Sequence, residues 1–165
     1  MGYGLAGLLF VLEIVAGIAD AFSEAVGFWI ALDIVTAVLG WFYWLYCVYK
    51  YHDIMFQVPG WDHPIGVGRA VGFHFIPLYN FYWVFKWPKE IANFANWRAQ
   101  AKIMSPIAAG SLMVAATLVG RFFDAAIGLA LIFSAGAYIS ARLRRAFAAP
   151  PPPPSPKIQS FQLGL

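Results

Sequence analysis

Charged residues are scarce in this chain, and their scarcity sets the class of protein. Only 12% of the 165 residues are Asp, Glu, Lys or Arg, while 61% are hydrophobic; in water-soluble domains about a quarter of the residues are charged. The apolar runs are about 17 to 24 residues long and do not alternate as strands do, so each is long enough to cross the bilayer as a helix. The composition therefore predicts an all-α integral membrane protein with a lipid bilayer as its solvent.

Several other features are missing. The chain has one cysteine, Cys47, which excludes an intrachain disulfide and a cysteine-based metal cluster. It contains no Gly-rich phosphate loop, nucleophile elbow or metal-binding helix motif. The net charge of +3 is small and lies beside the apolar runs rather than in a basic arm, so we expect no nucleic-acid partner. These absences predict a protein that is not an enzyme, and nothing in the sequence requires a cofactor.

The apolar runs divide the chain into a single membrane domain, 1–149, and a tail, 150–165. Four transmembrane helices are predicted as two hairpins, at 5–22 with 26–49 and at 106–123 with 125–142. Residues 66–87 are apolar but contain His74, Pro77 and Asn80. They predict a re-entrant aromatic segment with a turn at Pro77 to Asn80, in which Asn80 caps the returning limb. Residues 88–102 predict a helix that lies in the membrane interface.

The placement of basic residues favours four crossings over five. If residues 66–87 enter and leave on one side, only Arg121 lies outside, and both termini are cytoplasmic. The other ten of the eleven basic residues then lie on the cytoplasmic side: Lys50, Arg69, Lys86, Lys89, Arg98, Lys102, Arg142, Arg144, Arg145 and Lys157. The alternative is a spanning helix kinked at Pro77, which gives five transmembrane helices and divides the positive charges between the two sides.

A sequence pattern that occurs twice in the chain agrees with four crossings. Residues 45–51 read LYCVYKY and residues 81–87 read FYWVFKW. Aromatic residues with a lysine among them are typical of the point where a helix leaves the hydrocarbon. In the four-span arrangement both copies run to the cytoplasmic interface.

Two carboxylates lie well inside the apolar runs, Glu13 in the first and Asp33 in the second. Each is about ten residues from the turn near Ser23, so we expect them to meet at similar depth and share a proton. With Asp20 and Glu24 at its mouth, this pair could form a pathway for protons or cations, which is one alternative function. The competing interpretation is a buried carboxyl hydrogen-bonded to a neighbouring helix or subunit.

His74, between Phe73 and Phe75, is the histidine in an apolar context, and it could ligate the metal of a haem or chlorophyll. Binding of such a pigment is a second alternative function. The competing interpretation is an ordinary hydrogen-bonded histidine. His52 and His63 are interpreted as loop residues, and they show no zinc-ligand spacing.

The tail changes composition at residue 150. Pro150 to Pro156 predicts a stiff polyproline-type arm without internal hydrogen bonds. Beyond it, Ile158, Phe161 and Leu163 could anchor on another protein. Disorder is the competing interpretation for such a composition.

Residues 68–96 resemble a signature shared by uncharacterised bacterial membrane proteins, in which a glycine and a basic residue precede AVGF, followed by FIP, an asparagine and YW-x-F. Here it reads GRAVGF at 68–73, FIP at 75–77, Asn80 and YWVF at 82–85, with Asn96 near its end. The resemblance implies a multi-helix membrane fold and makes the turn at 77–80 a family feature. It implies no activity.

The function we expect is that of a non-enzymatic accessory or structural subunit. It would sit in a bacterial inner membrane and pack against other subunits of a larger complex, of the respiratory or photosynthetic kind. Small residues spaced by four in the last two apolar runs, such as Ala116 and Gly120, suit close helix packing. The missing catalytic motifs and the tail point the same way.

Overall fold

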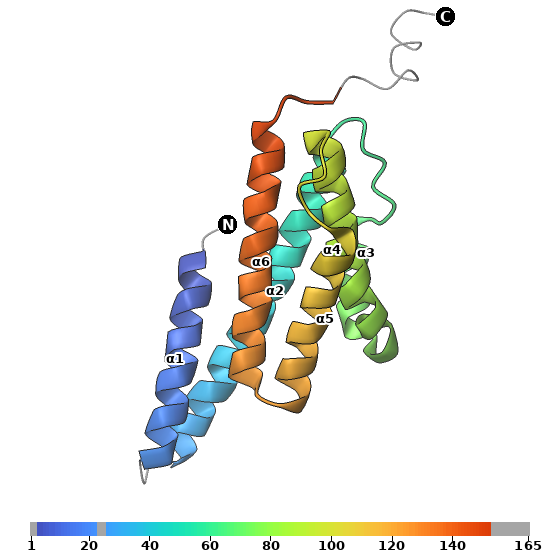
Figure 1. Ribbon diagram of the computed structural model, residues 1–165. Helices are drawn as coiled ribbons and strands as arrows, with labels where there is room; N and C mark the ends of the chain where they lie inside the picture. The colour runs from blue at the N-terminus through green and yellow to red at the C-terminus, as the bar shows by residue number, and fades with distance from the viewer. Residues whose placement is uncertain (1–2, 23–25, 153–165) are drawn as a thin grey trace, which may run out of the picture.

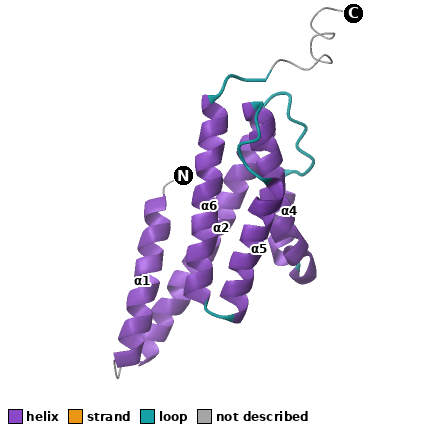
Figure 2. Ribbon diagram, viewed as in Figure 1, coloured by secondary structure: helices purple, strands orange, loops and turns teal. Residues whose placement is uncertain are grey.

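The computed structural model describes residues 3–22 and 26–152, and every regular element in these ranges is helical (Figures 1 and 2). The predicted all-helical fold is therefore confirmed. In chain order the elements are α1 (Tyr3–Phe22), α2 (Val26–Gln57), α3 (Val67–Gly72), the short 3-10 helix η1 (Phe73–Phe75), α4 (Pro77–Ala99), α5 (Pro106–Phe122) and α6 (Ala125–Ala148).

Two helices are long and apolar enough to cross a membrane. They are Ile30–Gln57 within α2 and Ala125–Ala148, which is α6. Shorter apolar helical stretches cover Gly7–Ala19 in α1 and Pro106–Phe122, which is α5. Each predicted hairpin thus combines one helix that is long and apolar enough to cross a membrane with one shorter apolar helical stretch.

The last two helices begin where local chemistry fixes them. The Ser105 hydroxyl accepts a hydrogen bond from the Ala108 N–H at 3.3 Å, and Pro106 fills the first helical position of α5, where a missing N–H costs little. Asp124 Oδ1 accepts from the Ile127 N–H at 2.8 Å and opens α6 in the same way. Capping side chains therefore set the boundaries at both points.

Two helices run past the ends predicted for them, because α2 continues from residue 49 to Gln57 and α6 from residue 142 to Ala148. The charged groups Lys50 and Asp53 of the α2 extension lie on its outer side, where Lys50 Nζ is 3.6 Å from Asp53 Oδ2. On its inner side Tyr51 and Met55 are fully buried. One face of α2 thus stays buried beyond the point in the sequence where the mean hydropathy falls. The packing of that face decides where the helix ends.

The aromatic core lies where the late parts of α2, α4 and α6 meet (Figure 1). Tyr51 of α2 stacks on Trp87 of α4 with ring centroids 6.0 Å apart, and its hydroxyl donates to the Gly136 carbonyl of α6 at 2.9 Å. Trp44 packs against Trp87 at 5.5 Å and against Phe133 at 6.0 Å. Helix α1 packs against α2 and α6 at the edge of this core.

Residues 66–87 fold back on themselves, as expected for a re-entrant segment. Helix α3 and η1 run toward the lower end of Figure 1, and α4 returns in the direction of α2. The two limbs touch, because the Phe73 ring lies 4.7 Å from Tyr79 and 5.0 Å from Trp83 between centroids. The single kinked helix of the alternative is therefore absent.

The turn of this hairpin differs from the prediction by a few residues. Ile76 is extended and precedes α4, while Pro77 and Asn80 form the first turn of the helix, with the Asn80 N–H donating to the Ile76 carbonyl at 2.8 Å. The predicted cap by the Asn80 side chain is wrong. Proline suits the first helical position because its φ is already helical.

The predicted interfacial helix at 88–102 is also wrong as a separate element. Helix α4 runs through Pro88 without interruption, and its late half is core rather than surface, since Ile91 and Phe94 are fully buried. The apolar face that suggested a membrane surface packs on protein instead. Burial of that face offsets the helical hydrogen bond that Pro88 cannot make.

Helices α5 and α6 approach closely through glycine. A Cβ built on Gly120 would lie 3.1 Å from the Gly128 Cα, and one built on Gly128 would overlap the Cα and N of Gly120. Ala116, one turn before Gly120, is 1% exposed. The predicted face of small residues is therefore in use at Ala116 and Gly120, with Gly128 as its unpredicted partner.

This asymmetry gives a test. Gly128→Ala forces a methyl group into backbone, so we expect a loss of stability of about 1–3 kcal/mol, the usual range for overpacking. Gly120→Ala should cost less stability, because a Cβ on Gly120 would make a tight contact with Gly128 but would not overlap its backbone. Gly17→Ala in α1 is the control; nothing lies within 4 Å of its Cβ, and alanine should gain up to about 1 kcal/mol from helix propensity. Unfolding followed by circular dichroism gives the order, and equal losses for Gly128 and Gly120 would contradict the packing.

Candidate functional site

The histidines of the described chain gather around one tryptophan, Trp83 of α4. The His52 ring, on α2, stacks on Trp83 with centroids 5.7 Å apart and planes 22° apart. The His74 ring, on η1, meets Trp83 edge-on at 6.4 Å. His63, in the loop between α2 and α3, contacts His52. We call His52, His63, His74 and Trp83 the histidine–tryptophan cluster.

His52 and His63 form a direct hydrogen bond, with 2.8 Å between Nδ1 of His52 and Nε2 of His63. One of these nitrogens carries the proton and the other accepts it, so the bond requires at least one neutral ring. His52 is fully buried and His63 partly so, and burial lowers the pKa of His63. The pair therefore joins the loop to α2, with at least one of the two imidazoles uncharged.

The prediction that His52 is a loop residue is wrong, because α2 continues past it. His63 does lie in the loop, yet it contacts a buried ring rather than solvent alone. A signal for His52 existed in the sequence: Val48, Tyr51 and Met55 continue the apolar spacing of the preceding helix across the charged residues. No sequence signal joins His52 to His63, because a loop separates them.

His74 behaves as the hydrogen-bonded histidine of the competing interpretation. Its Nδ1–H donates to the Ala70 carbonyl at 3.1 Å, which leaves Nε2 as the acceptor atom of a neutral ring. A large apolar groove of about 570 Å³ lies nearby, but its lining includes Phe75 and Val71 and not His74. This groove and the predicted axial ligand are thus separate, and binding of a haem or chlorophyll at His74 stays a prediction.

The cluster is short of ligands for a metal. Within the part of the chain that the structure describes, no three His, Cys, Asp or Glu side chains come close enough to hold an ion. Nε2 of His52, Nε2 of His74 and Nε1 of Trp83 are buried and find no hydrogen-bond partner there. The arrangement holds the loop and the hairpin against α2.

The predicted carboxylate pathway is only partly visible. Glu13 is buried in α1, with 6% of its surface exposed. Asp20 and Asp33 belong to α1 and α2, but their side chains, like the whole of Glu24, lie outside the described residues. The proposed meeting of Glu13 with Asp33 stays a prediction.

The tail is described only at its base. Pro150 is fixed, since Nη1 of Arg98 donates to the Ala149 carbonyl at 3.0 Å and to the Pro150 carbonyl at 2.9 Å. The Arg98 guanidinium also lies 5.4 Å from the centre of the Phe147 ring. The remaining predicted contact residues, Pro156, Ile158, Phe161 and Leu163, lie outside the described residues.

No protein family, no curated protein and no solved structure matches this chain.

The histidine pair makes stability depend on pH. Burial lowers the pKa of His63 in the folded protein. In the unfolded chain His63 keeps its ordinary pKa of about 6.5, so below that pH the unfolded chain binds more protons than the folded one. Stability therefore falls as the pH drops through about 6.5. Between about pH 7.5 and about pH 5, we expect the His63→Ala variant to lose less stability than the unchanged protein does. At the higher pH the variant should be about 1–3 kcal/mol less stable, because His52 Nδ1 loses its partner.

The measurement is the unfolding midpoint of the purified protein at the two pH values. Asp62→Asn, which changes the exposed neighbour of His63, is the control and should keep the pH dependence of the unchanged protein. A His63→Ala variant with the same pH dependence as the unchanged chain would contradict this role.

Proposed function

We propose that this chain is an integral membrane protein whose cytoplasmic boundary is marked by three cation–tyrosine pairs. In each pair a basic residue lies over the tyrosine four positions before it on the same helix. The three pairs belong to three different helices. The pairs are Lys50 over Tyr46 on α2 at 5.9 Å, Lys86 over Tyr82 on α4 at 5.4 Å, and Arg142 over Tyr138 on α6 at 5.1 Å.

The three pairs lie at one level, because residues beside them are in contact. Tyr51, next to Lys50, stacks on Trp87, next to Lys86. The Tyr51 hydroxyl is also 2.7 Å from the Ser140 hydroxyl, two residues before Arg142. Tyrosine rings and snorkelling basic side chains are enriched at the headgroup level of a bilayer. Three such pairs at one height support a boundary there.

The surface on one side of this level is apolar. Large side chains on four different helices stay at least half exposed, among them Leu8, Phe28, Ile107, Phe122 and Ile127. Such a surface would be costly in water, because moving one large apolar side chain out of water is favourable by about 1.5–3 kcal/mol of free energy. Lipid as the surrounding medium removes that cost.

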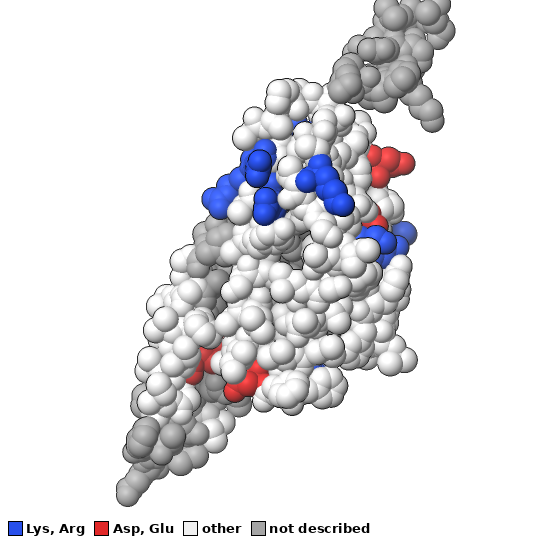
Figure 3. Space-filling model, in the orientation of Figure 1, with Lys and Arg blue, Asp and Glu red and all other residues white. Residues whose placement is uncertain are grey.

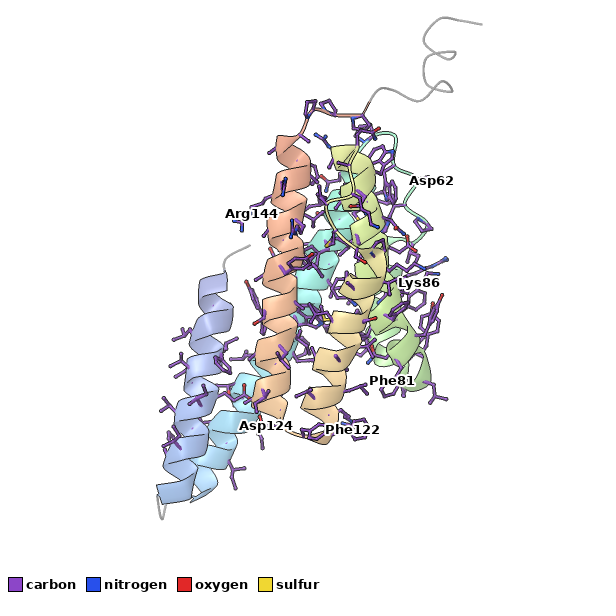
Figure 4. All side chains as sticks on the ribbon, viewed as in Figure 1. Asp62, Phe81, Lys86, Phe122, Asp124 and Arg144 are labelled. Atoms are coloured by element: carbon purple, nitrogen blue, oxygen red, sulfur yellow. The ribbon has the colours of Figure 1, made fainter. Side chains whose placement is uncertain are left out.

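The opposite boundary falls at the turn between α5 and α6. In Figure 4, Phe122 and Asp124 lie at the end away from Arg144. The 17 residues of α5 span about 25 Å, close to the hydrocarbon thickness, whereas the 32 residues of α2 span about 48 Å. Four helices then cross, and the late parts of α2, α4 and α6 extend beyond the cytoplasmic boundary. At the other boundary the end of α1 and the start of α2 reach past the turn between α5 and α6 (Figure 1).

The hairpin of α3, η1 and early α4 then re-enters from the cytoplasmic side. Its tip carries exposed apolar side chains, Phe75, Ile76 and Leu78, the last 87% exposed. Nine residues separate Pro77 from Lys86, which is about 14 Å, or half the hydrocarbon thickness. The segment therefore reaches mid-membrane and returns.

The visible charges agree with the positive-inside rule. On the face in Figure 3, most Lys and Arg side chains lie in the upper half, where α2, α4 and α6 end. The same bias supports the proposal that the protein lies in a bacterial inner membrane with both termini on the cytoplasmic side. The cytoplasmic extension, with the tail base held by Arg98, supports a role as a non-enzymatic accessory subunit that docks on a larger membrane complex.

Cysteine labelling tests the topology. In a Cys47→Ala background, Arg69→Cys and Lys89→Cys should react with a membrane-impermeant maleimide from the same side, and Asp124→Cys from the other. Each of these three residues is exposed, so reagent access is not limiting. Labelling of residues 69 and 89 from opposite sides would instead establish five crossings.

Docking is tested through the tail. Replacing Ile158, Phe161 and Leu163 together with serine should release the protein from its partners in mild detergent, because the apolar anchors are lost. The matched control replaces Gln159 and Gln162 with serine and should co-purify as before. Unchanged co-purification of the triple variant on native gels would refute the docking role and leave the membrane topology untouched.

A further inference from the structure

The groove of about 570 Å³ lies between α2 and the descending limb of the hairpin, and its walls are largely apolar. They are formed by Phe42, Leu45, Tyr46 and Tyr49 of α2, with Val71 of α3 and Phe75 of η1. From Phe42 to Lys50 the groove follows α2 for about 12 Å. Its volume is within the range of about 300–1,000 Å³ that small-molecule sites occupy.

The two ends of the groove differ, because one lies at Phe75 and the other at the charged Lys50. Phe75 meets Trp41 edge-on with ring centroids 5.2 Å apart, so the hairpin touches α2 at the deep end. At the boundary end, Lys50 lines the groove and its side chain is 39% exposed. The facing carboxylate is Asp53, whose oxygens are shared between Lys50 at 3.6 Å and the Gln57 amide at 2.8 Å.

We propose that this groove binds one phospholipid of the cytoplasmic leaflet, with an acyl chain between α2 and the hairpin and its phosphate on Lys50. The inference rests on the proposed membrane insertion. Under that topology the groove runs along the membrane normal, as an acyl chain does, and Lys50 sits at headgroup height. Half-exposed rings of Phe42 and Phe75 open the groove sideways to the bilayer.

The charge at the rim favours a phospholipid over an uncharged occupant. An ammonium donates three hydrogen bonds, and its contact with Asp53 at 3.6 Å is longer than a charge-assisted bond of about 2.7–2.9 Å. A phosphate at the rim would accept from Lys50 at the shorter distance. A purely apolar partner helix would offer Lys50 no anion in addition to Asp53.

Native mass spectrometry of the full chain, released from mild detergent micelles, tests the site with phosphatidylglycerol as probe. We expect one retained lipid per chain. Lys50→Ala should weaken retention about tenfold, the value of one charged hydrogen bond. Val71→Trp should abolish it by filling the groove. Diacylglycerol with the same acyl chains should be retained about tenfold more weakly as well, because it lacks the phosphate that Lys50 binds.

Two control variants keep the result specific. Arg142→Ala removes the same charge from an equivalent cation–tyrosine pair that does not line the groove, and Ile107→Trp adds the same bulk on an exposed face elsewhere. Both should retain the lipid as the unchanged chain does. Equal losses in these controls, or no loss in Lys50→Ala and Val71→Trp, would overturn the site.

Failure of the membrane proposal has a different signature. A chain that leaves the membrane fraction in alkaline carbonate would refute insertion and the lipid site together. A chain that resists extraction but retains no lipid in the groove would refute the lipid site alone. Retention of diacylglycerol as strongly as phosphatidylglycerol would show that Lys50 plays no part.

Discussion

The contact of Tyr51 with Trp87 and Gly136 fixes how three helices are placed against one another. The tyrosine ring stacks on α4, and its hydroxyl, buried and hydrogen-bonded, holds α6. A hydroxyl in such a place is costly to leave unpaired, so the axial register of α2, α4 and α6 is closely specified. That register brings the three basic residues with tyrosine neighbours to one height. The inferred membrane boundary, and with it the depth of the hairpin and the position of the groove, depends on this one junction.

The hairpin depends on a second aromatic residue one turn away. Trp83 lies on the same helix as Trp87 and is also fully buried, and its ring contacts the descending limb and α2. Phe73 and His74 reach it from the limb, and His52 reaches it from α2. Helix α4 is thus the central element, joined to the bundle by one tryptophan and to the re-entrant limb by the next. The bond between His52 and His63 adds the loop to the same assembly.

Much of this arrangement is readable from the sequence, and the misses share a cause. Hydropathy and capping residues locate the apolar helices, and the proline with its flanking aromatic residues locates the hairpin. The helix ends at 57 and 148, and the continuity of α4 through Pro88, are decided by burial against distant residues. The turn after α4 is another case: Asn96 accepts from the N–H groups of Ile103 and Met104, a contact that neither spacing nor propensity reveals. The histidine pair was missed because its members meet only after the loop folds over α2.

The sidedness of the hairpin agrees better with the proposed lipid surroundings than with a water-filled pore. Its polar atoms turn inward: His74 Nδ1 bonds to the Ala70 carbonyl, and His74 Nε2 and Asn80 Oδ1 are buried. Its outward side chains at the tip are apolar, with Leu78 the most exposed. A segment lining an aqueous path would show the opposite order, since broken helix at membrane depth needs polar groups facing water or protein. Here the protein side supplies that cover. The hairpin thus turns its polar atoms toward protein, and Phe73 and Trp83 are among the aromatic residues that hold it there.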